Sequence, residues 1–477
     1  ELLRDNFQAN RGLTGELEKL IDHPGQRQEY LELLAAGLQD NGQLLAAFDA
    51  YMLLIEALSE SVDIGTETVE QLHLVEKDLR VRRDRWIQVM LARLHSSASE
   101  EQKKQIDSVI LDRYVQAVES GRALPLREYL AYFGRHSSGL NARMQLASRL
   151  IESNQAIERE LLEAEIHLAT IQQSPDTSLH GEALARMALL LHKAERWPEA
   201  ARVYQQLATT YRDQVVLEGD TGRELMEEAM QDDLLSPYLD RVSWMKGRVN
   251  GPTVANNQGQ FPSYQRIYQM PLIELQGTLP PSTMVALDQT RNSLVIRDDF
   301  GTTLQRVSMS DGRRPVSSSQ YSISYARAHG HLMLLSLGPE IVAVDTIRNS
   351  QDPSEAILWR KRTTPPTTGD PRFVVNNLRT RSSMTPLGGR RYVAIDNQNR
   401  RLGVTGSITA SGICFIKMEQ LVCVDPLSGD EIWMRDNVTP GSDIYSDDSF
   451  VVLVPPDSNA MIKVYSAIDG RLLKSRP

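Results

Sequence analysis

The chain has 477 residues, 24% of them charged, and a net charge of −10. This length exceeds the size at which one hydrophobic core stops growing, so at least two domains are expected. No apolar run of about 18 residues occurs, and residues 1–10 lack the pattern of a signal peptide, which excludes a transmembrane helix or a secretion signal within this sequence.

Charge is distributed unevenly along the chain. Residues 1–235 contain 25 basic and 40 acidic side chains, a net charge of −15, whereas the remaining residues contain 27 basic and 22 acidic ones, a net charge of +5. Such an asymmetry would let the two halves attract each other or face different partners.

Residues 1–235 are predicted to be helical, because apolar residues recur at helical spacing and helix-forming residues dominate. Two segments repeat one pattern of small and large apolar residues at an offset of 153 positions, with a short turn in the middle of each. The first copy consists of Ala35, Leu38, Gly42, Leu44, Ala47, Tyr51 and Leu54, and the second of Ala188, Leu191, Glu195, Trp197, Ala200, Tyr204 and Leu207. Longer helices are expected between the copies, over 66–95 and 100–120.

The repeated pattern resembles the tetratricopeptide repeat, in which small residues let two antiparallel helices approach and an aromatic side chain fills the groove of the next repeat. The resemblance implies a degenerate helical-repeat domain over residues 1–235. A generic helical hairpin is the alternative. The packing residues that the tetratricopeptide resemblance implies are Ala35, Ala47, Tyr51, Ala188, Trp197, Ala200 and Tyr204.

Residues 236–270 begin a stretch rich in proline and glycine with little periodicity, which predicts a linker or an irregular first unit of the next domain. The domain boundary is therefore expected near residue 240.

Residues 271–477 have the pattern of short strands separated by turns. The clearest segment has apolar runs at 413–416 and 421–424, then Asp425, a turn at Ser428 and Gly429, and a third run that ends at Trp433. Looser copies occupy 331–359, 464–470 and 307–312. Gly429 and Gly470 are 41 positions apart, close to the roughly 40 to 45 residues of a four-stranded propeller blade.

This segment resembles the quinoprotein-type propeller repeat, in which an Asp and a Gly shape a turn and a Trp packs between neighbouring blades. The resemblance implies an α+β multidomain protein, a helical solenoid followed by part of a β-propeller with roughly four to five blades. Further blades are expected outside this sequence, because an open ring leaves an unpaired strand edge. An ordinary β-sandwich is the alternative. The implied blade residues are Asp345, Trp359, Asp425, Gly429, Trp433 and Gly470.

The two cysteines, Cys414 and Cys423, both lie in the clearest segment. If the hairpin turns at Met418 and Glu419, the two residues face each other across adjacent strands. Such a position permits either a cross-strand disulfide or a pair of buried thiols, of which thiols are favoured because Cys acts as a small hydrophobic residue in strands.

Catalytic signatures are missing from the sequence. It contains neither a His-Glu-x-x-His zinc motif nor a phosphate-binding Gly-x-x-x-x-Gly-Lys-Ser/Thr loop nor a Gly-x-Ser-x-Gly motif. Quinoprotein enzymes bind pyrroloquinoline quinone and calcium and often carry an adjacent Cys pair, which this chain lacks. We therefore expect no cofactor and assign no catalytic residue or metal ligand. His329 and His331 lack a supporting third ligand in the sequence, and Asp298, Asp299, Asp447 and Asp448 are expected in turns.

An arginine-rich stretch over 372–401 is interpreted as a solvated loop, because nucleic-acid binding would require interleaved exposed aromatic residues. We therefore expect protein partners and no nucleic acid. The pattern favours a scaffold without enzymatic activity, and a quinone-dependent oxidoreductase with its active centre in other blades is the alternative. The propeller half also resembles the outer-membrane protein assembly lipoprotein, although that family lacks the helical half. Both resemblances imply a bacterial cell envelope or periplasmic location.

Overall fold

A computed structural model of the chain shows two compact units. The first contains Glu1–Val75 and Val81–Ala142, and the second contains Glu76–Arg80 and Arg143–Pro477. The residues that the structure describes are 21, 23–62, 72–153, 159–242, 267–270, 272–288, 293–297, 303–309, 325–337, 340–347, 356–363, 379–384, 390–395, 403–439, 441–457 and 459–476.

The described part of the first unit is mainly helical. Its helices are α3 (Pro24–Asp40), α4 (Leu44–Val62), α5 (Arg83–Ser97), α6 (Glu100–Glu119) and α7 (Ala123–Phe133). Helix α6 confirms the helix predicted over 100–120, and Ser99 starts it with a capping box completed by Gln102.

The helix predicted over 66–95 is confirmed only over 83–95, which lies in α5, and is wrong over 73–81; residues 66–71 lie outside the described residues. A hairpin of β1 (His73–Glu76) and β2 (Leu79–Val81) precedes α5. In β2, Leu79 and Val81 are buried and Arg80 between them is not, which is the alternation of a strand with one buried face. The many charged residues around this alternation obscured the strand period.

The second unit begins with helices. They are α8 (Gly139–Glu152, which starts in the first unit), α9 (Arg159–Gln173), α10 (His180–Lys193), α11 (Trp197–Thr210), α12 (Gly222–Ala229) and α13 (Ser236–Val242), with a small hairpin of β3 (Val215–Leu217) and β4 (Asp220–Thr221) before α12. Helices give way to strands between 242 and 267, near the predicted boundary, but the compact units divide the chain elsewhere.

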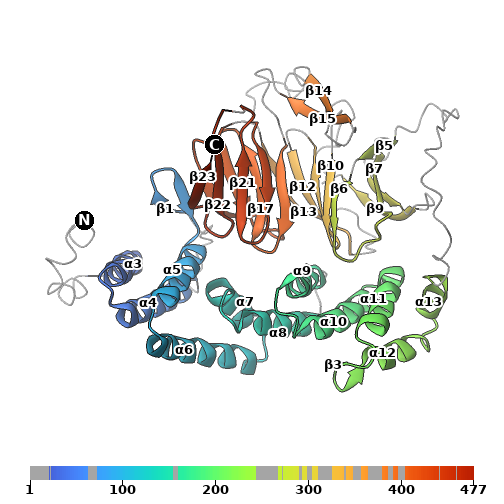
Figure 1. Ribbon diagram of the computed structural model, residues 1–477, viewed down its shortest axis with the longest axis horizontal. Coiled ribbons are helices and arrows are strands. Elements are labelled where there is room, and N and C mark those ends of the chain that lie inside the picture. Colours follow the sequence, from blue (N-terminus) through green and yellow to red (C-terminus); the bar gives the residue numbers. More distant parts are fainter. Residues whose placement is uncertain are drawn as a thin grey trace. The chain divides into compact units, whose positions relative to one another are not determined.

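Among the described residues after 266, four larger sheets follow (Figure 1), each built mainly from antiparallel neighbours. The first sheet is β5 (Ile267–Met270), β7 (Met284–Asp288), β8 (Ser293–Arg297) and β9 (Thr303–Ser308). The second is β6 (Leu272–Gln276), β10 (Tyr325–His329), β11 (Leu332–Ser336), β12 (Glu340–Asp345) and β13 (Ile357–Arg362). The third is β16 (Thr405–Thr409), β17 (Gly412–Lys417), β18 (Gln420–Val424) and β19 (Glu431–Arg435), extended at β19 by β2 and β1. The fourth is β20 (Asp443–Ser446), β21 (Phe450–Val454), β22 (Ile462–Ser466) and β23 (Leu472–Arg476).

A separate pair, β14 (Arg379–Met384) and β15 (Arg390–Ile395), forms a two-stranded sheet.

The inner strands of the second and third sheets are buried on both faces; all five residues of β11 are buried, for example. Continuous apolar runs are the sequence pattern of such doubly covered strands. The first and second sheets share one hydrophobic core, which includes Val285, Ile296, Met333 and Val344.

The structure thus confirms an α+β chain with helices first and antiparallel sheets afterwards. The three strands predicted around Cys414 and Trp433 are β17, β18 and β19.

Candidate functional site

Two tryptophans link successive sheets in the same way. Trp359 of β13 donates its indole N–H to the carbonyl of Pro426 over 2.9 Å, and Trp433 of β19 donates to the carbonyl of Ala467 over 2.9 Å. Each carbonyl lies in the turn before the last strand of the next sheet. The two indoles therefore join the second sheet to the third and the third to the fourth.

Glycine makes each of these contacts possible. Gly429 and Gly470 have φ angles of +76° and +69°, and a Cβ atom would lie 2.6 Å from Trp359 at the first and 2.5 Å from Trp433 at the second. Both the left-handed backbone and the approaching ring exclude a side chain. Asp425 shapes the first turn by accepting hydrogen bonds from the N–H groups of Leu427 and Ser428.

Strand register shows which residues occupy the tryptophan position in the other sheets. Trp359 pairs with Ala343 and Trp433 with Cys423, each directly before a bulge. Lys474 holds this position in the fourth sheet and Gln305 in the first. Within the described strands, a tryptophan therefore links only two pairs of successive sheets, the second with the third and the third with the fourth.

The predicted helical packing residues lie where two helices meet in each repeat copy. Ala35, Ala47, Ala188 and Ala200 are completely buried, as is Tyr51, while Tyr204 is buried and Trp197 is half-buried beside His192. Gly42 and Glu195, at equivalent positions, both have a positive φ, +73° and +58°, so the turns between the helices share one geometry.

A fully buried ion pair joins helix α9 to the second sheet. Glu165 of α9 accepts hydrogen bonds over 2.9 Å from both the backbone N–H and the Nδ1 of His331, which follows β10. The two side chains are 1% and 0% exposed. The hydroxyl of Thr278 donates to the same carboxylate over 2.5 Å. Burial alone would raise the pKa of Glu165, but His331 and Thr278 outweigh it and lower that pKa.

Two arginines, one directly before α11 and one within it, extend this contact. Arg196, the residue before α11, donates to the carbonyl of Ile347 over 2.8 Å and to Oε1 of Gln305 over 2.7 Å. Arg202 donates to the carbonyl of Thr278 over 2.5 Å. We call the set of Glu165, Thr278, His331, Arg196 and Asp345 the buried joint, since Asp345 is 1% exposed and ends β12 beside it.

Arg435 holds the added hairpin on the third sheet. Its guanidinium contacts Glu76 at 3.0 Å and Asp78 at 3.2 Å, donates to the carbonyl of Gly470 and lies over the ring of Tyr465. The backbone N–H of Asp436 donates to the carbonyl of Asp78, which continues the strand pairing.

The cysteines occupy the predicted register. Cys414 and Cys423 are paired residues of β17 and β18, and both are free, buried thiols. Burial, with Cys423 adding to the effect, raises the pKa of Cys414 well above its ordinary value, so this thiol is held protonated.

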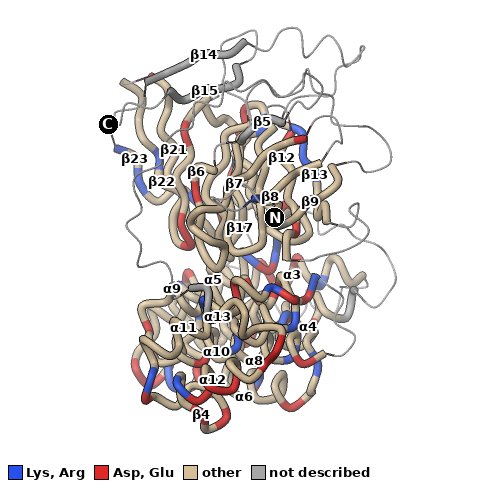
Figure 2. The backbone as a smooth tube through the Cα atoms, turned by 90° about the vertical axis from the view of Figure 1, so that its right-hand side faces the viewer, with Lys and Arg blue, Asp and Glu red and all other residues tan. Residues whose placement is uncertain are grey.

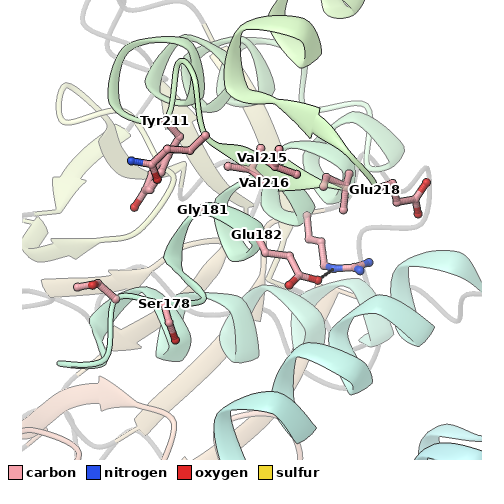
Figure 3. Close-up of a pocket in the computed structure, with 11 residues that line it drawn as sticks. Ser178, Gly181, Glu182, Tyr211, Val215, Val216 and Glu218 are labelled. Carbon is pink, nitrogen blue, oxygen red and sulfur yellow. Dashed lines mark hydrogen bonds and ion pairs between the residues drawn. The ribbon is translucent and has the colours of Figure 1, made fainter.

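A pocket of about 350 Å³ lies between α10 and the β3–β4 hairpin (Figure 3). Its lining combines the polar groups of Ser178, Glu182 and Tyr211 with Val215 and Val216. Glu182 is held by Arg186 over 2.9 Å. Gly181 gives the pocket its shape, because a Cβ atom there would lie 2.8 Å from Val216.

The segment beside the pocket, which includes β4 and α12, is rich in acidic residues (Figure 2). Between 212 and 234 the only exposed basic residues are Arg212 and Arg223, whereas seven acidic residues are exposed. Val215, Met230 and Leu234 are 67%, 53% and 61% exposed there. The exposed acidic residues are Asp213, Glu218, Asp220, Glu224, Glu227, Glu228 and Asp233.

The remaining sequence candidates are not gathered into a catalytic centre. Among the described residues no group of three or more His, Cys, Asp or Glu could hold a metal ion, so His329 and His331 lack further ligands there. Asp447 accepts hydrogen bonds in a turn, as predicted. None of the helices in the described ranges has the length and apolarity needed to cross a membrane. Asp298, Asp299, Arg372, Arg400 and Arg401 lie outside the described residues, as does most of 236–270.

Sequence reasoning did not find the buried joint. Glu165 stands among apolar residues in the run Leu161 to Leu168, which is a signal of a buried carboxylate in need of a partner. His331 lies 166 positions away, and no local spacing connects the two.

Comparisons with known proteins show little. No protein-family model matches the chain, and no curated protein sequence is similar to it. Solved structures that match in part are Hsv2 of Kluyveromyces marxianus (12% identity, TM-score 0.22, 41% of this chain and 46% of that one) and Hsv2 of Kluyveromyces lactis (11%, 0.20, 44% and 62%). A putative 6-phosphogluconolactonase from Bacteroides uniformis also matches (15%, 0.20, 42% and 52%). The matched part thus spans about half of these proteins' length, and similarity at this level assigns no function.

Proposed function

We propose that this protein is a non-enzymatic scaffold that binds protein partners, with tetratricopeptide-like helices and quinoprotein-type propeller blades. The observation that carries the proposal is the surface at the β3–β4 hairpin. An exposed apolar side chain, Val215, stands at the edge of a polar pocket between α10 and the β3–β4 hairpin. Exposed apolar side chains with a polar rim are typical of protein-binding surfaces.

The finer architecture is supported by the repeated tryptophan step. The rings of Trp359 and Trp433 each cover a left-handed glycine of the following sheet, Gly429 and Gly470, at equivalent register positions. Such regular contact between successive antiparallel sheets is what stacked blades require. Propeller and helical-repeat surfaces both bind partners without chemistry of their own. A bacterial cell envelope or periplasmic setting is part of the same proposal.

Site-specific photo-crosslinking tests the proposed function. A photoreactive residue at Val215 should form discrete adducts with a protein partner in the native organism, and Glu218→Lys in the same chain should reduce their yield. A photoreactive residue at Leu111, 43% exposed on α6, provides the control. Equal adducts at both positions, or none at Val215, would contradict the proposal.

A further inference from the structure

The pocket beside the β3–β4 hairpin contains more negative than positive charge. Its charged lining residues are two carboxylates, Glu182 and Glu218, and one guanidinium, Arg186, which leaves a net charge of −1. Arg186 is paired with Glu182 over 2.9 Å and lies 3.9 Å from Glu152 as well. Glu218 is exposed in the turn between β3 and β4 and forms no ion pair with any described residue. The one cation of the lining is therefore shared by two other carboxylates, and the charge of Glu218 is left for a ligand.

The neighbouring chain strengthens this negative charge. Asp213 and Asp220, on either side of β3 in the sequence, are both exposed. Arg223 lies 3.9 Å from Asp213 and 3.9 Å from Glu227, so acidic groups already surround it. An electric field of this sign repels anions and attracts cations, so the complementary occupant of the pocket is positively charged.

The pocket also has an apolar wall. Val215, Val216 and Leu217 supply it, and Val215 is 67% exposed (Figure 3). The hydroxyl of Tyr211 in the same lining has no hydrogen-bond partner among the described residues. A bare metal ion would leave Val215 uncovered. A long side chain with an apolar stem and a cationic head fits both parts of the lining, and arginine and lysine have this form.

We propose that the pocket holds an arginine side chain from a basic segment of a partner protein. The inference rests on the proposed function, because it names the chemistry of the partner that the scaffold binds. The aliphatic stem lies on Val215, and the guanidinium faces the carboxylates of Glu218 and Glu182, with the hydroxyl oxygen of Tyr211 as a further acceptor. Arginine suits the site better than lysine, since its guanidinium is more weakly hydrated and donates to several acceptors at once.

Isothermal titration calorimetry of the full chain tests the proposal with a defined probe, the acetylated and amidated peptide Gly-Arg-Leu-Arg-Gly. The control peptide carries citrulline in place of both arginines, which keeps the shape of arginine and removes its charge. The arginine peptide should bind saturably, and the citrulline peptide should bind at least about fivefold more weakly. Equal affinity for the two peptides, or no binding of the arginine peptide, would overturn the proposal.

Two charge reversals then locate the binding site. Glu218→Lys and Asp112→Lys change the net charge of the chain equally, but Asp112 is exposed on α6 of the first unit. Glu218→Lys should weaken binding of the arginine peptide about tenfold, because repulsion replaces attraction in the pocket. Asp112→Lys should leave the affinity within about twofold. Similar losses for the two variants would show attraction to the acidic chain as a whole and would overturn the assignment to the pocket.

The crosslinking test of the proposed function separates its failure from the failure of this inference. Mass spectrometry should place the adduct of the photoreactive residue at Val215 within a few positions of an arginine in the partner. Discrete adducts on a segment without basic residues would support the scaffold and overturn the basic ligand. No adducts at Val215 would contradict the scaffold and this inference together.

Discussion

Single residues connect the sheets and helices of the second unit. Trp433 is completely buried, and its indole both fills space and donates a hydrogen bond to Ala467. Glu165 is equally enclosed but charged. Trp433 stabilises by removing apolar area from water, and the buried charge of Glu165 is compensated by the hydrogen bonds that His331 and Thr278 donate to it.

Trp433→Ala should lower the free energy of unfolding by about 3 to 5 kcal/mol, because it leaves a cavity and an unpaired carbonyl. Urea denaturation measures this loss. Trp197→Ala is the control and should cost less, since that ring is half-buried. A loss for Trp433→Ala below about 0.5 kcal/mol would contradict its place between the sheets.

Glu165→Gln should cost about 3 kcal/mol near neutral pH, because it leaves His331 without its charged partner in a dry site. Since the pKa of Glu165 is lowered, its stabilisation is present above the ordinary carboxyl range and is lost as the pH falls below it. The difference in urea stability between wild type and variant should therefore shrink on acidification. Glu182→Gln removes a partly exposed ion pair and should change stability little. Equal costs for the two variants would contradict the account of the joint.

At the scale of elements, turns decide how closely the sheets approach. Gly470 and Gly42 both have left-handed φ angles, +69° and +73°, but only Gly470 faces a ring, whereas nothing lies within 4 Å of a Cβ atom at Gly42. A comparison of substitutions at Gly42 and Gly470 therefore distinguishes the cost of backbone strain from the cost of a clash with a neighbouring side chain.

Gly42→Ala should cost about 1 kcal/mol from backbone strain alone. Gly470→Ala should cost at least about 2 kcal/mol more, because Trp433 must move. Thermal or urea unfolding of both variants measures the difference. Similar losses at the two positions would show that the tryptophan does not press on the turn.

The sequence predicts some elements better than others for physical reasons. Strands β17 to β19 are short apolar runs around a turn with Asp425 and Gly429, so local rules are sufficient. The helix pairs follow from small residues such as Ala188 and Ala200 at helical spacing. Hairpin β1–β2 was not predicted, because it is held by Arg435, which lies more than 350 positions away in the sequence, at the edge of another sheet. The buried joint was not predicted for the same reason, since its contacts join residues far apart in the sequence.

At the scale of the whole molecule, a scaffold is the function that we propose. Charged groups such as Glu165, Arg196 and Arg435 are engaged in joining elements, and the pocket beside Val215 lies between α10 and the β3–β4 hairpin. An enzyme of the quinoprotein type would instead need residues that hold a quinone and calcium.

The most direct test of the scaffold proposal is a titration of the full protein with pyrroloquinoline quinone and calcium, followed by thermal unfolding. A ligand that binds only the folded state at a hundredfold excess over its Kd adds about 2.7 kcal/mol of stability. The account predicts no change in Tm at any concentration of the two together. A saturable rise in Tm that requires both would contradict it and would assign the protein a cofactor.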